Sequence, residues 1–173
     1  MFKLMQYIGH IYTIFLPMIF AAIANMIWCK LPICKFMKKP MDFGRSMKDG
    51  RRIFGDNKTW KGFTGMIVLS AVFSLLTGIY TFWAGAYLGL SYVIAELPNS
   101  FVKRRMGLEA GKNGSFVQTF FDQADSVIGF IVFLPLVYPE TWSDALGLLV
   151  LGTATHYIFN VLLYLVGLRN QKG

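Results

Sequence analysis

The sequence predicts an all-α protein that crosses a membrane about five times and carries two polar cytosolic loops. Hydrophobic residues make up 55% of the 173 residues, and the mean hydropathy is +0.50. The apolar residues are gathered in runs that approach the roughly 20 residues that a helix needs to cross a bilayer. The chain length suits one unit, so we expect residues 1–173 to form a single integral-membrane domain.

The predicted spans are the five apolar runs, at about residues 5–28, 63–80, 81–97, 126–142 and 145–168. The second and third runs follow each other almost without a linker, which predicts a helical hairpin. The fourth run is short and contains Pro135, which predicts a kink or a start below the headgroups. The first run is similar to a secretion signal, but its apolar character continues to Trp28, so we expect it to remain as a span.

Charge defines the predicted orientation. The chain has 17 basic and nine acidic residues and a net charge of +8. Apart from Lys3, all the basic residues lie in two polar loops and the C-terminal tail. The loop at about 29–62 contains Lys30, Lys35, Lys38, Lys39, Arg45, Lys48, Arg51, Arg52, Lys58 and Lys61. The loop at about 98–125 contains Lys103, Arg104, Arg105 and Lys112, and the tail contains Arg169 and Lys172. The positive-inside rule then places both loops and the C-terminus in the cytoplasm. We therefore expect a multi-pass protein of the cell membrane, with no nucleic-acid partner.

The first loop ends in Gly-Asp-Asn-Lys-Thr-Trp-Lys-Gly at 55–62. A Gly-Asp-Asn run favours a tight turn, and the groups after it can surround an anion. The substrate-binding residues predicted here are Gly55, Asp56, Asn57, Lys58, Thr59 and Lys61. The alternative is an ordinary basic loop that is attracted to anionic lipid. A Walker A loop is excluded, because the near match at 107–113 has the wrong spacing and no preceding strand.

A second polar motif, Glu-Leu-Pro-Asn-Ser-Phe-Val-Lys-Arg-Arg, covers residues 96–105. Pro98 is expected to end the third helix, and Ser100 to cap a new turn, with Lys103 and Arg104 following within about one turn. The alternative is a cluster at the membrane interface in which Glu96 pairs with a lysine while long side chains snorkel.

Two acids, Asp122 and Asp125, precede the fourth apolar run. Their spacing places them on one face of a helix, and we expect them at its N-terminus, where the helix dipole favours anions. Capping explains one acid, but two adjacent carboxylates repel unless a cation lies between them. The sequence therefore predicts a metal site. In the fifth run, His156 and Asn160 share a face, and we expect them to form interhelical hydrogen bonds.

These three motifs, in this order, resemble those of the CTP-dependent cytidylyltransferases of lipid synthesis. The motifs fall within residues ~40–130, and the hydropathy pattern matches over the whole chain. The sequence is most similar to the small CDP-archaeol synthase branch, which is related to phosphatidate cytidylyltransferase (CDP-diacylglycerol synthase). The phosphatidate enzymes carry a His-Gly-Gly tract where this chain has Val-Gln-Thr-Phe-Phe at 117–121, and the family usually has Asp where this chain has Glu96.

The resemblance implies a reaction of phospholipid biosynthesis. A membrane lipid phosphate, either an archaeal-type diether glycerol phosphate or phosphatidate, attacks the α-phosphorus of CTP, and CDP-lipid and pyrophosphate are formed. It also implies Mg²⁺ as cofactor. The implied catalytic residues are Lys103, Arg104, Asp122 and Asp125, the implied further substrate-binding residues are Ser100 and Arg105, and the implied metal ligands are Asp122, Asp125 and Glu96. The sequence leaves the oligomeric state open.

Two other functions fit parts of the pattern. A CTP-dependent lipid-alcohol kinase of the polyprenol or phytol type would transfer the γ-phosphoryl group instead. A non-catalytic membrane transporter would use polar residues at the midplane as an ion path. The transporter is disfavoured because the ionisable residues gather at one face, with only His156 deep in a span.

Overall fold

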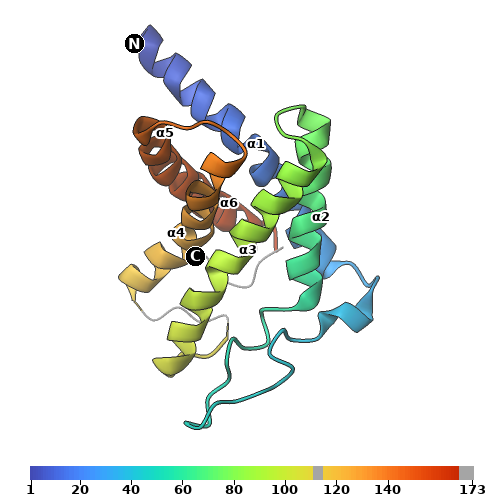
Figure 1. The fold of residues 1–173 in the computed structure, drawn as a ribbon. Coiled ribbons are helices and arrows are strands. Elements are labelled where there is room, and N and C mark those ends of the chain that lie inside the picture. Colours follow the sequence, from blue (N-terminus) through green and yellow to red (C-terminus); the bar gives the residue numbers. More distant parts are fainter. Residues whose placement is uncertain (111–114, 168–173) are drawn as a thin grey trace.

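The computed structural model describes residues 1–110 and 115–167, which form a helical bundle (Figure 1). The elements are α1 (Phe2–Lys30), η1 (Lys35–Lys38), α2 (Trp60–Thr77), α3 (Phe82–Arg105), α4 (Phe116–Phe133), η2 (Leu134–Leu136), α5 (Trp142–Gly147), the π-helical turn η3 (Leu148–Gly152) and α6 (Thr153–Leu165). Within the described ranges, extended pairing is limited to two isolated bridges, Pro40 with Thr59 and Ser46 with Arg52. The all-α prediction is confirmed.

Within residues 1–110 and 115–167, four helical segments are long and apolar enough to cross a membrane, namely Phe2–Lys30, Trp60–Thr77, Val117–Leu136 and Trp142–Leu165. The remaining predicted span lies in α3, which has 24 residues and ends in three consecutive basic residues. This polar end explains why α3 is less apolar than the other four segments. The predicted polytopic membrane architecture is thus confirmed.

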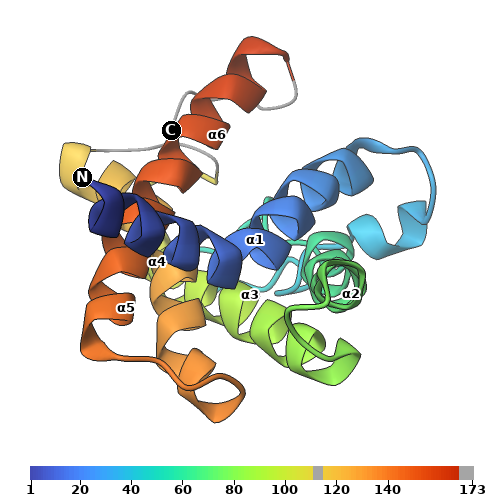
Figure 2. The ribbon, with the colours of Figure 1, turned by 90° about the horizontal axis from the view of Figure 1, so that it is seen from above.

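The predicted hairpin of the second and third spans is formed by α2 and α3. Gly78, with a φ of +69°, ends α2, and the Thr81 side chain caps α3 by accepting a hydrogen bond from the Ala84 N–H. The two helices approach closely at Gly85, where an added Cβ would lie 2.3 Å from the Ser74 Oγ. In Figure 2, α3 lies between α2 and α4, so the helix that approaches α2 closely is also the neighbour of α4.

Two predicted helix boundaries are wrong. Helix α3 continues through Pro98 to Arg105, so Ser100 is a buried residue inside a helix and not a cap. Proline removes one backbone donor, but a helix packed on both sides in a bundle tolerates this loss. Helix α4 begins at Phe116, where the Ser115 side chain and Gln118 form a capping box. Helix therefore covers residues 98–105 and 116–125 of the predicted second loop at 98–125.

With these boundaries, the two aspartates and the proline of the fourth span lie at other places in the helix than predicted. Asp122 and Asp125 lie within α4 and not at its N-terminus, so helix capping no longer accounts for either acid. Pro135 lies in η2, after the end of α4 at Phe133, so it ends the helix instead of kinking it. The acids are consequently carried by a regular helix, which fixes their mutual orientation.

The connection between α1 and α2 lies at the same end of the bundle as the C-terminal end of α3. Figure 1 shows residues 31–59, hereafter the 31–59 loop, below the helices beside the end of α3, while the α2–α3 turn and α5 lie at the opposite end. The Arg105 guanidinium donates to both carboxylate oxygens of Asp49 at 2.7 Å and so joins the loop to α3. Among the basic residues used for the predicted orientation, Lys112, Arg169 and Lys172 lie outside the described residues.

The core lies between α1, α3 and α4. Phe15 of α1 meets Phe130 of α4 in an edge-to-face arrangement with ring centroids 5.1 Å apart. The fully buried apolar side chains around them include Ile11, Ile14, Met18, Leu88, Val127, Leu134 and Leu148. This packing holds α3 and α4 side by side and presents their polar ends to the 31–59 loop.

Candidate active site

A cavity of about 720 Å³ opens where the polar ends of the helices meet the 31–59 loop. Ten of the residues predicted for the site line it, namely Asp56, Asn57, Lys58, Thr59, Lys61, Glu96, Ser100, Lys103, Asp122 and Asp125. Its other wall is apolar and comes mainly from α1, through Phe15, Met18, Ile19, Ala22, Ile23 and Met26, with Phe159 and Leu163 of α6. One cavity therefore joins charged groups to a hydrocarbon-like surface.

Asp122 and Asp125, hereafter the aspartate pair, face the same side of α4. The Asn99 side-chain amide of α3 donates to Asp122 Oδ1 at 2.7 Å and to Asp125 Oδ2 at 2.8 Å. The prediction that the two acids share one helix face is confirmed. Asn99 itself was not predicted, because the expected break at Pro98 hid its place on the face of α3 that also carries Glu96 and Lys103.

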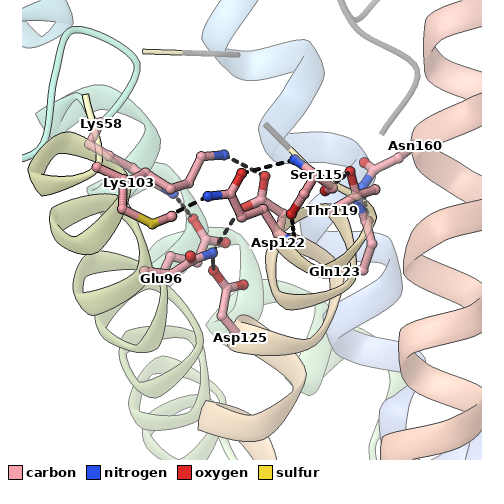
Figure 3. Close-up of polar contacts among 12 residues, drawn as sticks. Lys58, Glu96, Lys103, Ser115, Thr119, Asp122, Gln123, Asp125 and Asn160 are labelled. Atoms are coloured by element: carbon pink, nitrogen blue, oxygen red, sulfur yellow. Dashed lines mark hydrogen bonds and ion pairs between the residues drawn. The ribbon is translucent and has the colours of Figure 1, made fainter. Parts of the chain in front are cut away.

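Two lysines from different elements bind carboxylates in this cavity. The Lys103 ammonium of α3 donates to Asp122 Oδ2 at 2.6 Å, and the Lys58 ammonium of the 31–59 loop is hydrogen-bonded to Glu96 (Figure 3). Burial lowers the pKa of Lys58. The negative charge of Glu96, together with that of the aspartate pair, outweighs burial and leaves the pKa raised, so Lys58 remains protonated.

The Gly-Asp-Asn run forms the predicted turn. Gly55 adopts a φ of +99°, which glycine reaches without steric cost, and its carbonyl accepts a hydrogen bond from the Lys58 N–H at 3.3 Å. Asp56 is exposed and pairs with Arg52 at 2.8 Å. The Thr59 hydroxyl caps α2 by accepting from the Gly62 N–H at 3.2 Å. The turn thus delivers Lys58 to the cavity immediately before α2 begins.

Lys61 lines the cavity, but its ammonium is bound elsewhere. The residue is only 1% exposed. Its Nζ donates to the carbonyl oxygens of Leu31 and Ile33 at 2.8 Å each and lies 4.7 Å from the centroid of the Trp28 ring. These contacts tie the first turn of α2 to the end of α1 and to the start of the 31–59 loop. Lys61 therefore lies in the wall of the cavity with its ammonium group already bound.

Gly55, Arg104 and Arg105 do not line this cavity. Gly55 and Arg104 line a second cavity of about 590 Å³ with Arg51, Arg52, Asp56, Gly107, Leu108, Glu109 and Ala110. Arg104 is only 6% exposed, although its Nε has no hydrogen-bond partner in the part of the chain that the structure describes. Asp56 borders both cavities, so the two cavities adjoin at this turn. The guanidinium carbon of Arg105 lies 5.1 Å from the Phe101 ring centroid, and the same guanidinium binds Asp49 of the 31–59 loop.

The prediction of interhelical hydrogen bonds for His156 and Asn160 is confirmed. Nδ1 of His156 lies 3.0 Å from the Gln123 carbonyl oxygen, and the Asn160 amide donates to the Gln123 side-chain oxygen. Gln123 was not predicted, because a neutral residue between two acids carries no signal until the opposing helix is known. These contacts join α4, which carries the aspartate pair, to α6.

The aspartate pair fits a magnesium ion in part. Over residues 1–110 and 115–167, no three His, Cys, Asp or Glu side chains converge on one point, and Glu96 is engaged with Lys58. Mg²⁺ is commonly held by one or two carboxylates together with substrate phosphates and water. The two carboxylates of α4 supply that minimum, with room in the cavity for phosphate oxygens.

Comparison with known proteins identifies the family of this chain. A family model described as CarS-like, CDP-archaeol synthase, matches residues 4–172. The chain is 37% identical over 139 residues to the CDP-archaeol synthase of Methanopyrus kandleri, covering 76% of this chain and 78% of the relative. It is 33% identical over 134 residues to that of Pyrococcus furiosus, covering 72% and 78%.

A solved structure of an intramembrane enzyme for archaeal membrane lipid biosynthesis shares the fold. Its TM-score is 0.63 at 24% identity, and the alignment covers 89% of this chain and 92% of the other. With the family match over nearly the whole length, these findings show that the chain belongs to the CDP-archaeol synthase family, a group of membrane-embedded cytidylyltransferases.

Proposed function

We propose that this protein transfers the cytidylyl group of CTP to the phosphate of an archaeal-type diether lipid and releases pyrophosphate. The supporting observation is the composition of the larger cavity, where the aspartate pair, Lys58 and Lys103 lie at one side and the apolar residues of α1 at the other. A two-chain lipid cannot leave hydrocarbon cheaply, and CTP cannot enter it. A cavity with both kinds of wall is where the two substrates can meet.

The residues suit a reaction in which the substrate brings its own nucleophile. The lipid phosphate attacks the α-phosphorus, so the protein needs only to position two polyanions and stabilise the charge of the departing pyrophosphate. The side-chain nitrogens of Lys58 and Lys103 lie against carboxylates, where they can also donate hydrogen bonds to phosphate oxygens. Asn99 keeps the two acids of the aspartate pair in a fixed orientation.

We propose that the aspartate pair holds Mg²⁺, with Glu96 as a further candidate ligand. When bound, the ion supplies Lewis-acid stabilisation of phosphate oxygens. Binding of a cation by the carboxylates would release Lys103 from Asp122 and make its ammonium available to substrate. The same exchange at Glu96 would release Lys58.

Arg104 is assigned to a phosphate group in the second cavity, which it lines together with Gly55 and Asp56. Its buried guanidinium shares the second cavity with Arg51 and Arg52, and phosphate oxygens match the guanidinium fork. Ser100 lies in the larger cavity on the α3 face beside Glu96 and Lys103, where its hydroxyl can contact either substrate. We place this whole end of the bundle in the cytoplasm, because the basic residues of the 31–59 loop gather there.

The test uses purified protein, Mg²⁺ and CTP labelled separately at the α and γ positions. We expect α-label to enter lipid only when a two-chain lipid phosphate is present, with an equal amount of pyrophosphate. A panel of diether glycerol phosphate and phosphatidate tests the lipid preference, and we expect the diether compound to be used at least as well. Entry of γ-label into a lipid alcohol would instead establish the kinase, and failure of both labels to reach lipid would favour a non-catalytic membrane protein.

A further inference from the structure

Asp42 is a buried acid of the 31–59 loop that lies outside both cavities. It is 5% exposed and accepts five hydrogen bonds. Its Oδ1 accepts from the Gly44 N–H at 3.1 Å and from Arg52 Nη2 at 2.5 Å. Its Oδ2 accepts from Arg52 Nε at 3.3 Å and from the N–H groups of Phe54 and Gly55 at 3.0 Å each.

These contacts keep Asp42 ionised. Burial raises the pKa of its carboxyl group, but the Arg52 guanidinium and the backbone N–H groups of Gly55, Phe54 and Gly44 outweigh burial and hold the pKa well below its ordinary value. An Asn side chain has nearly the same shape as Asp but only one acceptor oxygen, so it cannot replace a carboxylate that accepts on both oxygens. An Asn side chain would turn its own N–H₂ group toward a donor, whichever way the amide faced.

Asp42 is connected to the backbone of Lys58 through Gly55, and its neighbour Met41 binds Lys58 directly. The Gly55 N–H is fixed by Asp42, and the Gly55 carbonyl accepts from the Lys58 N–H. On the other side, the Met41 N–H donates to the Lys58 carbonyl at 2.8 Å. The backbone of Lys58 is thus held by the residue next to Asp42 and by the turn that Asp42 organises.

We propose that Asp42 is a positioning residue for the cytidylyl transfer, because it shapes the 52–58 segment so that Lys58 reaches into the cavity beside Glu96. The expected effect on turnover rests on the proposed function. The effect of Asp42 on the position of Lys58 does not depend on that function. Arg52 serves the same arrangement from the opposite side, since it binds Asp42 and Asp56 with one guanidinium.

The first experiment measures the position of Lys58 without catalysis. The full-length protein is treated with an amine acetylating reagent, and the acetylation rate of Lys58 is followed by mass spectrometry. We expect Asp42→Asn to raise this rate about tenfold, because the turn opens and Lys58 leaves Glu96. The matched control is Asp144→Asn, which removes another buried carboxylate that accepts from a backbone N–H, at the opposite end of the bundle.

Gly55→Ala provides a second route if Asp42→Asn does not fold. Alanine at a φ of +99° is strained, and its Cβ would lie 3.0 Å from that of Ala110, so the turn must move while Asp42 stays intact. We expect Lys58 acetylation to rise in this variant as well. An unchanged Lys58 acetylation rate in the folded variants overturns the positioning role.

The second experiment compares turnover in two backgrounds. We expect Asp42→Asn to lower kcat about 10- to 100-fold in the otherwise unchanged enzyme, but less than about twofold when Lys58 is already alanine. Equal losses in both backgrounds would show that Asp42 acts through another residue and overturn the proposal. If Lys58→Ala itself has full activity while Asp42→Asn still raises acetylation, the positioning holds and the catalytic assignment of Lys58 fails.

Discussion

Replacement of Asp122 by Asn tests the core of the candidate site. Asp122 accepts from Asn99 on one oxygen and from the Lys103 ammonium on the other. An Asn side chain cannot satisfy both donors, since one face of its amide carries N–H₂. The Lys103 and Asp122 side chains are only 10% and 16% exposed, so water screens the lost ion pair weakly.

The two expected effects differ in size. Loss of one charged hydrogen bond in this position costs about 1.5–3 kcal/mol of the free energy of unfolding. Loss of a metal ligand removes transition-state stabilisation on the order of 4 kcal/mol, which lowers turnover about 1000-fold. The variant is therefore expected to remain folded and to be almost inactive, and Asp125→Asn is expected to behave alike.

The assay follows label from α-labelled CTP into lipid, beside a thermal unfolding curve for each variant. Asp144→Asn serves again as control, because it disturbs a buried carboxylate bonded to Thr141 at the far end of the bundle. That variant is expected to lose stability and keep turnover. If folded Asp122→Asn and Asp125→Asn both retain turnover within about tenfold of the unchanged enzyme, the metal-site reasoning is refuted.

Three further predictions concern Glu96, orientation and pH. Glu96→Asp is expected to retain turnover, whereas Glu96→Gln is expected to lose at least about tenfold because Lys58 loses its partner; full activity of Glu96→Gln in the lipid assay would remove Glu96 from the site. A single cysteine at Lys48 is expected to resist an impermeant thiol reagent in intact cells, and labelling there would reverse the proposed orientation. Asp42 has a folded-state pKa below its unfolded value of about 3.9, so its stabilisation is complete above that pH and is lost as the pH falls through the folded-state pKa. Unfolding curves of the unchanged protein and Asp42→Asn should therefore converge below about pH 4, and a gap that widens there would contradict this reasoning.

The sequence predicted the parts of this molecule that depend on local composition. Apolar runs located the helices, and spacing alone placed both members of the aspartate pair on one face. The wrong boundaries at Pro98 and Phe116 have different causes. Pro98 is unfavourable in an isolated helix, but packing against neighbouring helices lets α3 continue past it. The capping box at Ser115 is a local signal that starts α4 earlier than its hydropathy suggests.

Residues that depend on contacts distant in sequence were not predictable in the same way. Asn99 and Gln123 are neutral side chains whose roles appear only when α3 meets α4 and α4 meets α6. Asp42 was not predicted, because the five donors around it are arranged only by the fold of the 31–59 loop. The pairing of Lys58 with Glu96 joins two motifs that the sequence had shown only separately.

The division of the site between the 31–59 loop, α3 and α4 has a consequence for biogenesis. The chain emerges from the ribosome in order, so the loop and Lys58 are made first, Glu96 and Lys103 later, and the aspartate pair later still. A nascent chain that has inserted only α1, α2 and α3 already carries both lysines but lacks both aspartates. Such an intermediate lacks the proposed metal ligands, so under the proposed function we expect activity to begin only when α4 has entered the membrane and docked against Asn99.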